Sequence, residues 1–211
     1  MGEEMNIVII GSGGHARVVA DILLAMDGMN PLGFVSGDGE AGTPGPLGLS
    51  ILGDDGSLDS IEHDGVVVAI GDNALRQRLF EQLCAAGENL VAAVHPSAII
   101  AADVVVGKGC MISAGSIVNT GSRIMDNTIL NTGSVVDHDS NVGPHAHIAP
   151  NAALAGNVTV AEAALVGIGA NVIPGRIIGK RAVVGAGAAV IRDIPEGAVA
   201  VGVPARVVSG S

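Results

Sequence analysis

A repeat of six residues runs through the second half of the chain. Counting in steps of six from Val94 to Val190, all 17 positions hold an aliphatic residue. Four residues after each of them stands Ala, Val, Cys, Ser or Thr in 15 of the 17 cases, the exceptions being Arg176 and Ile194. A helix cannot keep one face at this period, and a flat strand repeats every two residues. The pattern therefore predicts a coil of three short strands per turn, so that each turn consists of three successive repeats.

Such coils stack into a parallel β-helix. Neighbouring coils hydrogen-bond at a spacing of roughly 4.8 Å and bury one continuous aliphatic column. The composition agrees, because the chain of 211 residues has 2 Phe, no Trp and no Tyr, yet 48% of its residues are hydrophobic. Its core must therefore consist of Val, Ile, Leu and Ala rather than aromatic rings. A β-helix with no catalytic role is the alternative that this pattern leaves open.

The first 90 residues follow a different pattern, in which strand-like and helix-like segments alternate. Such alternation predicts a small parallel sheet of the Rossmann-like βαβαβ type. The expected elements are strands over 5–10, 32–35 and 66–70 and helices over 15–26 and 74–86. We therefore expect two domains, residues 1–90 and residues 91–211.

A glycine-rich loop, residues 11–14, joins the first expected strand to the first helix. Backbone N–H groups and a helix N-terminus at such a turn favour a phosphate. We expect a bound mononucleotide there, with His15 donating to a phosphate or a sugar. Two alternatives stay open. One is a dinucleotide whose ribose contacts Asp38, although 90 residues are half of a dinucleotide domain. The other is a tight turn without ligand, in which His15 only caps the helix.

Charge and cysteine content narrow the class of protein. Lys and Arg number 10 against 21 Asp and Glu, a net charge of −11, which argues against nucleic acids and anionic membranes as partners. No stretch of about 18 residues stays apolar, and the start of the chain carries acids where a signal peptide carries basic residues. Cys84 and Cys110 are isolated, as in a reducing compartment. We expect a cytoplasmic protein without membrane insertion.

Four motifs carry a resemblance to a known family. They are IVIIGSGGHARVVAD near the start, VHPSA at the junction, NTGSVVDHDSNVG in the middle coils and GVPAR near the end. Together they resemble bacterial hexapeptide-repeat sugar acyltransferases of the sialic-acid O-acetyltransferase type, which include N-acetyltransferases of nucleotide-linked 4-amino-sugars. The resemblance implies a left-handed β-helix, a hand that the period does not give, since parallel crossovers are ordinarily right-handed. It also implies acetyl-CoA as co-substrate and a homotrimer with active sites between subunits.

The resemblance assigns the catalytic base to His138 and its acidic companion to Asp139, where some relatives carry Glu. An amine or hydroxyl that attacks a thioester must lose a proton, and a neutral imidazole accepts one near pH 7. Gly156 lies one coil after His138 and matches a position whose N–H approaches the acyl group, where it can stabilise an oxyanion. A solvated turn at His138 and Asp139, and a plain corner glycine, are the alternatives.

Further residues match CoA contacts of the family or lie in a basic segment. Five of the ten basic residues stand in the last 36 positions beside two acids, which favours the phosphates of CoA, with an ordinary solvated rim as the alternative. Arg176 departs from the repeat, and we expect its side chain to turn outward. The residues expected to bind CoA are His147, Gly156, Ile168, Lys180, Gly185, Ala186 and Arg206.

His138, His145 and His147 raise the alternative of a metal site like that of γ-class carbonic anhydrases. Zinc requires three or four convergent ligands. These histidines lie on one or two adjacent coils, a spread unlike that family's, so we expect no metal.

We expect an acetyl-CoA-dependent N-acetyltransferase acting on a UDP- or GDP-linked 4-amino-sugar. Transfer is expected to be direct, since no cysteine stands near the base. An O-acetyltransferase of sialic acid or a related sugar, and a non-catalytic sugar-nucleotide-binding protein, are the alternatives. The residues expected to bind the sugar nucleotide are Gly11, Ser12, Gly13, Gly14, His15, Asp38, Gly71, Asn73, Arg76 and Asn131.

Overall fold

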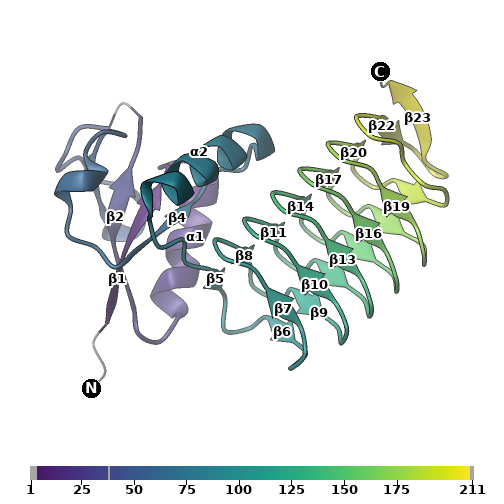
Figure 1. Cartoon of the computed structure of the whole chain (residues 1–211), viewed down its shortest axis with the longest axis horizontal. Helices are drawn as coiled ribbons and strands as arrows, with labels where there is room; N and C mark the ends of the chain where they lie inside the picture. Colours follow the sequence, from purple (N-terminus) through teal and green to yellow (C-terminus); the bar gives the residue numbers. More distant parts are fainter. Residues whose placement is uncertain (1–3, 38, 210–211) are drawn as a thin grey trace. The chain divides into compact units, whose positions relative to one another are not determined.

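The chain forms two compact units, Met1–Pro96 and Ser97–Ser211. The computed structural model describes residues 4–37 and 39–209 (Figure 1). Within this part of the chain, no helix has both the length and the apolar character needed to cross a bilayer.

The first unit contains a parallel sheet with the strand order β3-β2-β1-β4. Its elements are β1 (Met5–Ile10), α1 (Gly14–Ala25), β2 (Met29–Val35), the 3-10 turn η1 (Pro46–Gly48), β3 (Ser50–Gly53), the 3-10 turn η2 (Leu58–Ser60), β4 (Gly65–Val68), α2 (Asn73–Ala86) and β5 (Ala93–Val94). The three strands and two helices expected from the sequence are all present. β3 was not expected, because its four residues follow a Gly- and Pro-rich stretch; it forms by pairing Ile51 with Phe34 of β2.

This unit ends later than residue 90, the domain boundary expected from the sequence. Residues 89–91 still pair with β4, since the Val66 N–H donates to the Asn89 carbonyl and the Val91 N–H donates to the Val66 carbonyl. The short segment after α2 is therefore part of the first unit.

The two helices are fixed by local signals. α1 buries Ala16, Val19, Ala20 and Leu23, a spacing that gives one apolar face. α2 is capped at its N-terminus by Asp72, whose carboxylate accepts from the Leu75 N–H at 2.8 Å, and at its C-terminus by Gly87, which has a φ of 86°.

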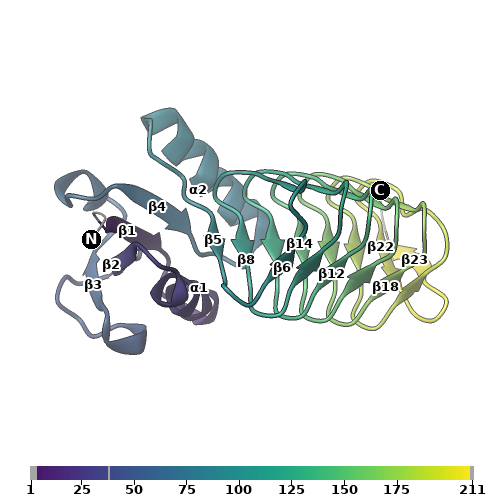
Figure 2. The same cartoon turned by 90° about the horizontal axis from the view of Figure 1, so that it is seen from below.

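The second unit is a parallel β-helix of two-residue strands, shown from two directions in Figures 1 and 2. From β6 to β18, each strand pairs in parallel with the strand three repeats later, as Ile124 does with Val142, so the predicted coil length is confirmed. The strands are β6 (Ile99–Ile100), β7 (Val105–Val106), β8 (Met111–Ile112), β9 (Ile117–Val118), β10 (Arg123–Ile124), β11 (Ile129–Leu130), β12 (Val135–Val136), β13 (Asn141–Val142), β14 (His147–Ile148), β15 (Ala153–Leu154), β16 (Thr159–Val160), β17 (Leu165–Val166), β18 (Asn171–Val172), β19 (Ile177–Ile178), β20 (Val183–Val184), β21 (Ala189–Val190), β22 (Val199–Val201) and β23 (Arg206–Ser209).

The strands form three faces, which the chain visits in turn. Among the strands of the second unit, sheet I holds β8, β11, β14, β17, β20, β22 and β23; sheet II holds β6, β9, β12, β15, β18 and β21; sheet III holds β7, β10, β13, β16 and β19. We call the turns between them the I–II, II–III and III–I corners. Each kind of corner recurs once per coil, so residues that are three repeats apart lie next to each other on adjacent coils.

The second residue of each strand points into the interior. From Ile112 to Val190, every sixth residue is at most 3% exposed, whereas Ile100 and Val106 at the first coil are half-buried. The small residues four positions later are buried as well, and several hydroxyls among them bond to the next coil: Ser122 Oγ donates to the Asp137 carbonyl at 2.9 Å. Arg176 turns outward as expected, toward Asp193 at 3.6 Å.

The corners impose a second period of six that was not expected from the sequence. Every sixth residue from Gly109 to Gly187 has a φ between 55° and 74°. Glycine, Asn and Asp tolerate this left-handed conformation best, and they fill most of these positions. Asp139 is one of them, with a φ of 56°.

Candidate active site

His138 and Asp139 form a pair on the II–III corner after β12. The Nδ1 atom of His138 lies 2.8 Å from Oδ2 of Asp139, so the side chain of this aspartate is long enough to reach the imidazole. The His138 side chain is 55% exposed. Because the carboxylate accepts the Nδ1–H, the lone pair is left on Nε2, where a base must carry it.

A second carboxylate, Asp137, supports the same histidine from the other side. Its Oδ1 accepts the His138 backbone N–H at 2.8 Å and the Asn119 amide at 2.7 Å. These two hydrogen bonds, the Asn119 bond first, hold the pKa of Asp137 below its ordinary value. The hydrogen bond to Asp139, and then the negative charge of Asp137, raise the pKa of His138 above its ordinary value.

Gly156 lies against the imidazole of His138, as its place one coil later predicts. A Cβ on Gly156 would stand 2.5 Å from Nε2 and 2.6 Å from Cε1 of the ring, closer than real side chains approach. A backbone hydrogen bond joins the two neighbouring corners, since the Asn157 N–H donates to the His138 carbonyl at 2.9 Å. A side chain at position 156 would displace the His138 ring.

A groove of about 490 Å³ runs along sheet II beside this corner. It is mostly apolar, with polar groups from Asn119, Asp137 and Asn171, and its volume falls in the range of small-molecule sites, roughly 300–1,000 Å³. The groove contains the residues directly before His138 and Gly156, namely Asp137 and Ala155. His138 and a mostly apolar groove therefore adjoin each other.

Apart from Gly156, the residues expected to bind CoA lie elsewhere on the β-helix. Ile168, Gly185 and Ala186 occupy the I–II corner, where Ile168 is 58% exposed and Ala186 is exposed. Asn131 stands on the same corner, and its amide Nδ2 lies 3.1 Å from Nε2 of His147 on β14. In one chain, His138 and these residues occupy different corners.

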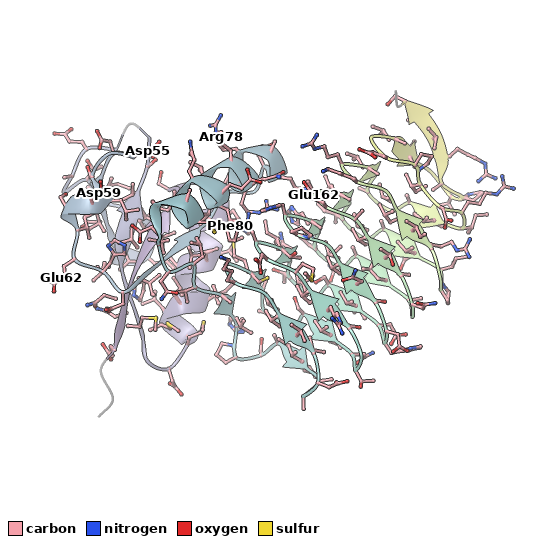
Figure 3. All side chains as sticks on the ribbon, in the orientation of Figure 1. Asp55, Asp59, Glu62, Arg78, Phe80 and Glu162 are labelled. Atoms are coloured by element: carbon pink, nitrogen blue, oxygen red, sulfur yellow. The ribbon has the colours of Figure 1, made fainter. Side chains whose placement is uncertain are left out.

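The basic residues near the C-terminus are partly engaged within the protein. Lys180 Nζ lies 2.8 Å from the carboxylate of Glu162, which Figure 3 labels. Arg206 donates from Nη1 to the Ala205 carbonyl at 2.8 Å. Lys180 is thus less available for a phosphate than its charge suggested.

In the first unit, the glycine loop meets the loop after β4, where the strand order reverses between β1 and β4. Gly11 has a φ of 105°, and a Cβ there would stand 2.6 Å from the Ile70 side chain. Gly13 and Gly14 face open space within 4 Å. In open α/β sheets ligands bind at such a reversal, which also brings Gly71 and Asn73 near the loop.

Arg76 is fully buried in this unit, and His15 is half-buried. Burial, and then the charge of Arg76, lower the pKa of His15 to about 4, so this ring is neutral near pH 7. Arg76 is fully buried and donates to the Ile70 and Gly71 carbonyls and to Asn73 Oδ1. Its guanidinium shapes the loop after β4. Asp38 lies outside the described residues.

The histidines considered for a metal do not converge. His138 is on the II–III corner, His147 is on sheet I, and His145 is on the III–I corner beside the Asn127 amide at 2.8 Å. Within residues 4–37 and 39–209, no group of three or more His, Cys, Asp and Glu side chains is arranged to hold a metal ion.

Three residues were missed by sequence reasoning. Asp137 precedes His138, but only the acid after the histidine was considered. Asn119 stands one coil before Asp137, so the coil length predicts their contact. Arg17, discussed below, lacks a comparable signal.

Comparisons with known proteins cover both units. The family described as PglD N-terminal domain matches residues 6–83. PerB of Caulobacter crescentus, solved with CoA and GDP-perosamine, is 43% identical with a TM-score of 0.90, over 99% of this chain and 98% of that one. The acetyltransferase domain of PglB from Neisseria gonorrhoeae, solved with acetyl coenzyme A, is 31% identical with a TM-score of 0.90, over 97% and 100%.

Among curated proteins, the UDP-N-acetylbacillosamine N-acetyltransferase of Bacillus subtilis is 36% identical over 111 residues, 49% of each chain. The chain thus spans half the length or less of the curated relatives it matches.

A Rossmann-like unit joined to a parallel β-helix with a His–Asp pair on one corner defines a hexapeptide-repeat acyltransferase. Since solved relatives match along nearly their whole length, the left-handed β-helix is confirmed. The chain belongs to the family of sugar N-acetyltransferases that includes PerB and PglB.

Proposed function

We propose that this enzyme transfers the acetyl group of acetyl-CoA to the amino group of a nucleotide-linked 4-amino-sugar, with His138 as general base. The Caulobacter relative is a perosamine N-acetyltransferase solved with GDP-perosamine, and the Bacillus relative is named for a UDP-linked sugar. The observation that carries the assignment is the exposed His138, bound by Asp139 at 2.8 Å and seated on Gly156 beside the groove.

The reaction follows from this geometry. The sugar amine attacks the thioester carbonyl, and Nε2 of His138 takes the proton that the nitrogen loses as the C–N bond forms. The tetrahedral intermediate then breaks its C–S bond, and the imidazolium returns the proton to the leaving thiolate. Asp139 stabilises the transient positive charge. Burial raises the pKa of the Cys110 thiol to about 12, so it is no nucleophile for an acyl-enzyme.

The remaining roles complete the proposal. The first unit, Met1–Pro96, binds the sugar nucleotide and the second unit, Ser97–Ser211, carries the acyltransferase site. The proposed contacts with acetyl-CoA are His147, Gly156, Ile168, Lys180, Gly185, Ala186 and Arg206. The proposed contacts with the sugar nucleotide are Gly11, Ser12, Gly13, Gly14, His15, Asp38, Gly71, Asn73, Arg76 and Asn131.

We also propose a homotrimer whose active sites lie between subunits. In one chain, His138 is on the II–III corner and Ile168, Gly185 and Ala186 are on the I–II corner. A cyclic arrangement places the II–III corner of one copy beside the I–II corner of the next. The outward residues Ile99, Ile117, Val135 and Ala153 give sheet II an apolar surface suited to such contacts. The cytoplasm is the proposed location, supported by two free cysteines.

Release of CoA in the presence of candidate acceptors tests the function. We expect turnover with UDP- or GDP-linked 4-amino-sugars and a loss of at least about 10²-fold in His138→Ala, the size of a general base's contribution. Near-normal turnover in this variant would remove His138 from the mechanism.

The two alternatives give different results in the same assay. An O-acetyltransferase would release CoA with free sialic acid and not with the amino-sugar nucleotides. A non-catalytic binding protein would bind a nucleotide sugar but release no CoA with any acceptor, in the wild type and in His138→Ala alike.

A further inference from the structure

The first unit holds a polar cavity beside the glycine loop that the proposed function does not yet use. It measures about 430 Å³ and is lined by Ser12, Arg17, Ile51 and residues 43–46. Ser12 belongs to the glycine loop, and its hydroxyl donates to Ser36 Oγ at 2.9 Å. Arg17 is an exposed residue early in α1. The cavity thus connects the loop after β1 with the segment that leads into β3.

Arg17 is one of few positively charged residues in an acidic unit. Residues 1–96 contain 14 Asp and Glu but three basic residues, Arg17, Arg76 and Arg78. Arg76 is fully buried and donates to backbone carbonyls, and Arg78 projects from α2 (Figure 3). Arg17 is therefore the cation that lines the cavity. An anionic substrate approaching this acidic unit needs such a positive group.

The neighbouring groups favour the same ligand charge. α1 begins without a capping side chain and without an acid in its first turn, so the positive end of its dipole favours a negative charge at this point. Gly13 and Gly14 leave open space in front of this helix end. No Asp or Glu lines this cavity in the described part of the chain.

A second cavity in the same unit serves as a contrast. It measures about 270 Å³ and is lined by apolar residues of β1, β2 and α2 together with Asp55, Asp59 and Glu88, but by no Lys or Arg among the described residues. Figure 3 labels Asp55 and Asp59, which lie on the connection between β3 and β4. Three carboxylates would repel a diphosphate, so this cavity does not suit a nucleotide.

We propose that Arg17 binds the diphosphate of the sugar nucleotide in the cavity beside Ser12, with the nucleoside against residues 43–46. This inference rests on the proposed function, to which it adds a residue that selects diphosphate-linked sugars over free sugars. A guanidinium offers two parallel N–H donors to phosphate oxygens, which an ammonium cannot match. The volume suits a nucleoside diphosphate, since small-molecule sites occupy roughly 300–1,000 Å³.

Calorimetric titration without CoA tests the proposal. UDP, GDP and the corresponding nucleosides, uridine and guanosine, are titrated separately into the wild type and into Arg17→Gln. The affinity of each diphosphate is then compared with that of its nucleoside. We expect the better-bound diphosphate to lose about 10- to 100-fold in affinity in Arg17→Gln, the size of a charge-assisted hydrogen bond, and its nucleoside to lose little. The affinity of Arg17→Lys for the diphosphate should lie between those of the wild type and Arg17→Gln. In turnover, the KM for the sugar nucleotide should rise while kcat and the KM for acetyl-CoA stay near wild type.

Arg78→Gln is the matched control, because it removes the same charge from an exposed helix position outside the cavity. It should bind UDP and GDP as the wild type does. Equal losses for the nucleoside and the diphosphate, equal losses in both variants, or no binding of either diphosphate by the wild type would overturn the role of Arg17. A wild type that binds a diphosphate through Arg17 but acetylates no amino-sugar nucleotide would instead refute the proposed function alone.

Discussion

At the scale of the residue, the electrostatics of His138 come from its two sequence neighbours. Asp139 binds Nδ1, while Asp137 binds the backbone N–H and adds a second negative charge nearby. Both favour the protonated imidazole and so raise the pKa of His138. A general base must be neutral to accept a proton. Because the pKa of His138 is raised, activity should begin to fall at a higher pH during acidification than it would if this histidine had an ordinary pKa.

The pH profile of Asp139→Asn tests this account. Removing the carboxylate removes the largest cause of the raised pKa, so the acidic limb of kcat should move to lower pH. The plateau should fall about ten- to hundredfold, because the ring loses its orientation. Asp137→Asn should shift the limb in the same direction by less, since Asp137 acts on the ring through its charge. An acidic limb that stays in place in Asp139→Asn would contradict the assignment of this pair.

Gly156→Ala tests the contact between neighbouring coils. Its Cβ would stand 2.5 Å from Nε2, so the imidazole must rotate away from the reacting position. We expect kcat to fall by about 10²-fold, since misplacement by about 1 Å costs that much. The melting temperature should change little, because the exposed ring has room to move.

Gly175→Ala is the control for this change. Gly175 lies on the same kind of corner one coil later, with a φ of 71° and open space around it. The variant should lose about 1 kcal/mol of stability from the left-handed conformation but retain kcat. Equal kcat values in the two variants would show that the contact with His138 is unimportant.

At the scale of the element, an imidazole joins the segment before β4 to the end of α2. His63 Nδ1 lies 2.6 Å from the Ile61 carbonyl and Nε2 lies 3.0 Å from Glu88. Both partners accept hydrogen bonds, so the ring satisfies both when it is doubly protonated. These bonds and the charges of Glu88 and Asp64 outweigh burial and raise the pKa of His63.

This contact makes the stability of the first unit depend on pH. Because the folded pKa is raised, the stabilisation is fully present below the unfolded value of about 6.5 and is lost as the pH rises through the folded pKa. Glu88→Gln should lower stability by on the order of 1.5 kcal/mol at pH 6 and by little at pH 9. Hydrogen exchange of the Val66 and Val91 amides measures this, since the chain lacks Trp and Tyr.

Glu62→Gln is the control, because Glu62 is exposed beside His63 in the sequence, as Figure 3 shows it on the surface of the first unit. It should leave exchange nearly unchanged at both pH values. A Glu88→Gln effect that is the same at pH 6 and pH 9 would contradict the charged state of His63.

At the scale of the whole molecule, the three-sided β-helix separates the proposed base from the proposed CoA contacts on the I–II corner, Ile168, Gly185 and Ala186. Mixing two inactive chains tests the sharing of sites between subunits. Co-expressed His138→Ala and Ile168→Glu should regain about a quarter of wild-type activity, because random assembly pairs an intact II–III corner with an intact I–II corner at that frequency.

Co-expression of His138→Ala with Gly156→Ala is the matched control. Both changes lie on the II–III corner, so no mixed site is intact and activity should not exceed that of Gly156→Ala alone. A monomer by light scattering, or no recovery in the first mixture, would contradict sites shared between subunits.

Much of this architecture could be read from local patterns. The six-residue repeat predicted coils of three repeats each, because each inward position along the column must be aliphatic. The same arithmetic placed Gly156 beside His138. It did not reveal β3, since four residues acquire strand character only when Phe34 of β2 pairs with Ile51. It also did not reveal the Asn119–Asp137 contact, although the two residues are one coil apart.

The sequence by itself determined the elements that depend on periodicity and local signals: the coil length, the helices and the residue types able to carry acetyl transfer. Tertiary structure decided which charged groups are available. Arg76 donates to backbone carbonyls and Lys180 pairs with Glu162, so both already have partners within the chain, while Arg17 lines an open cavity. The reason is that the availability of a charged side chain depends on partners distant in the chain, which a count of charges cannot reveal. The repeat, in contrast, is visible in the sequence because every coil must place an aliphatic residue in the interior.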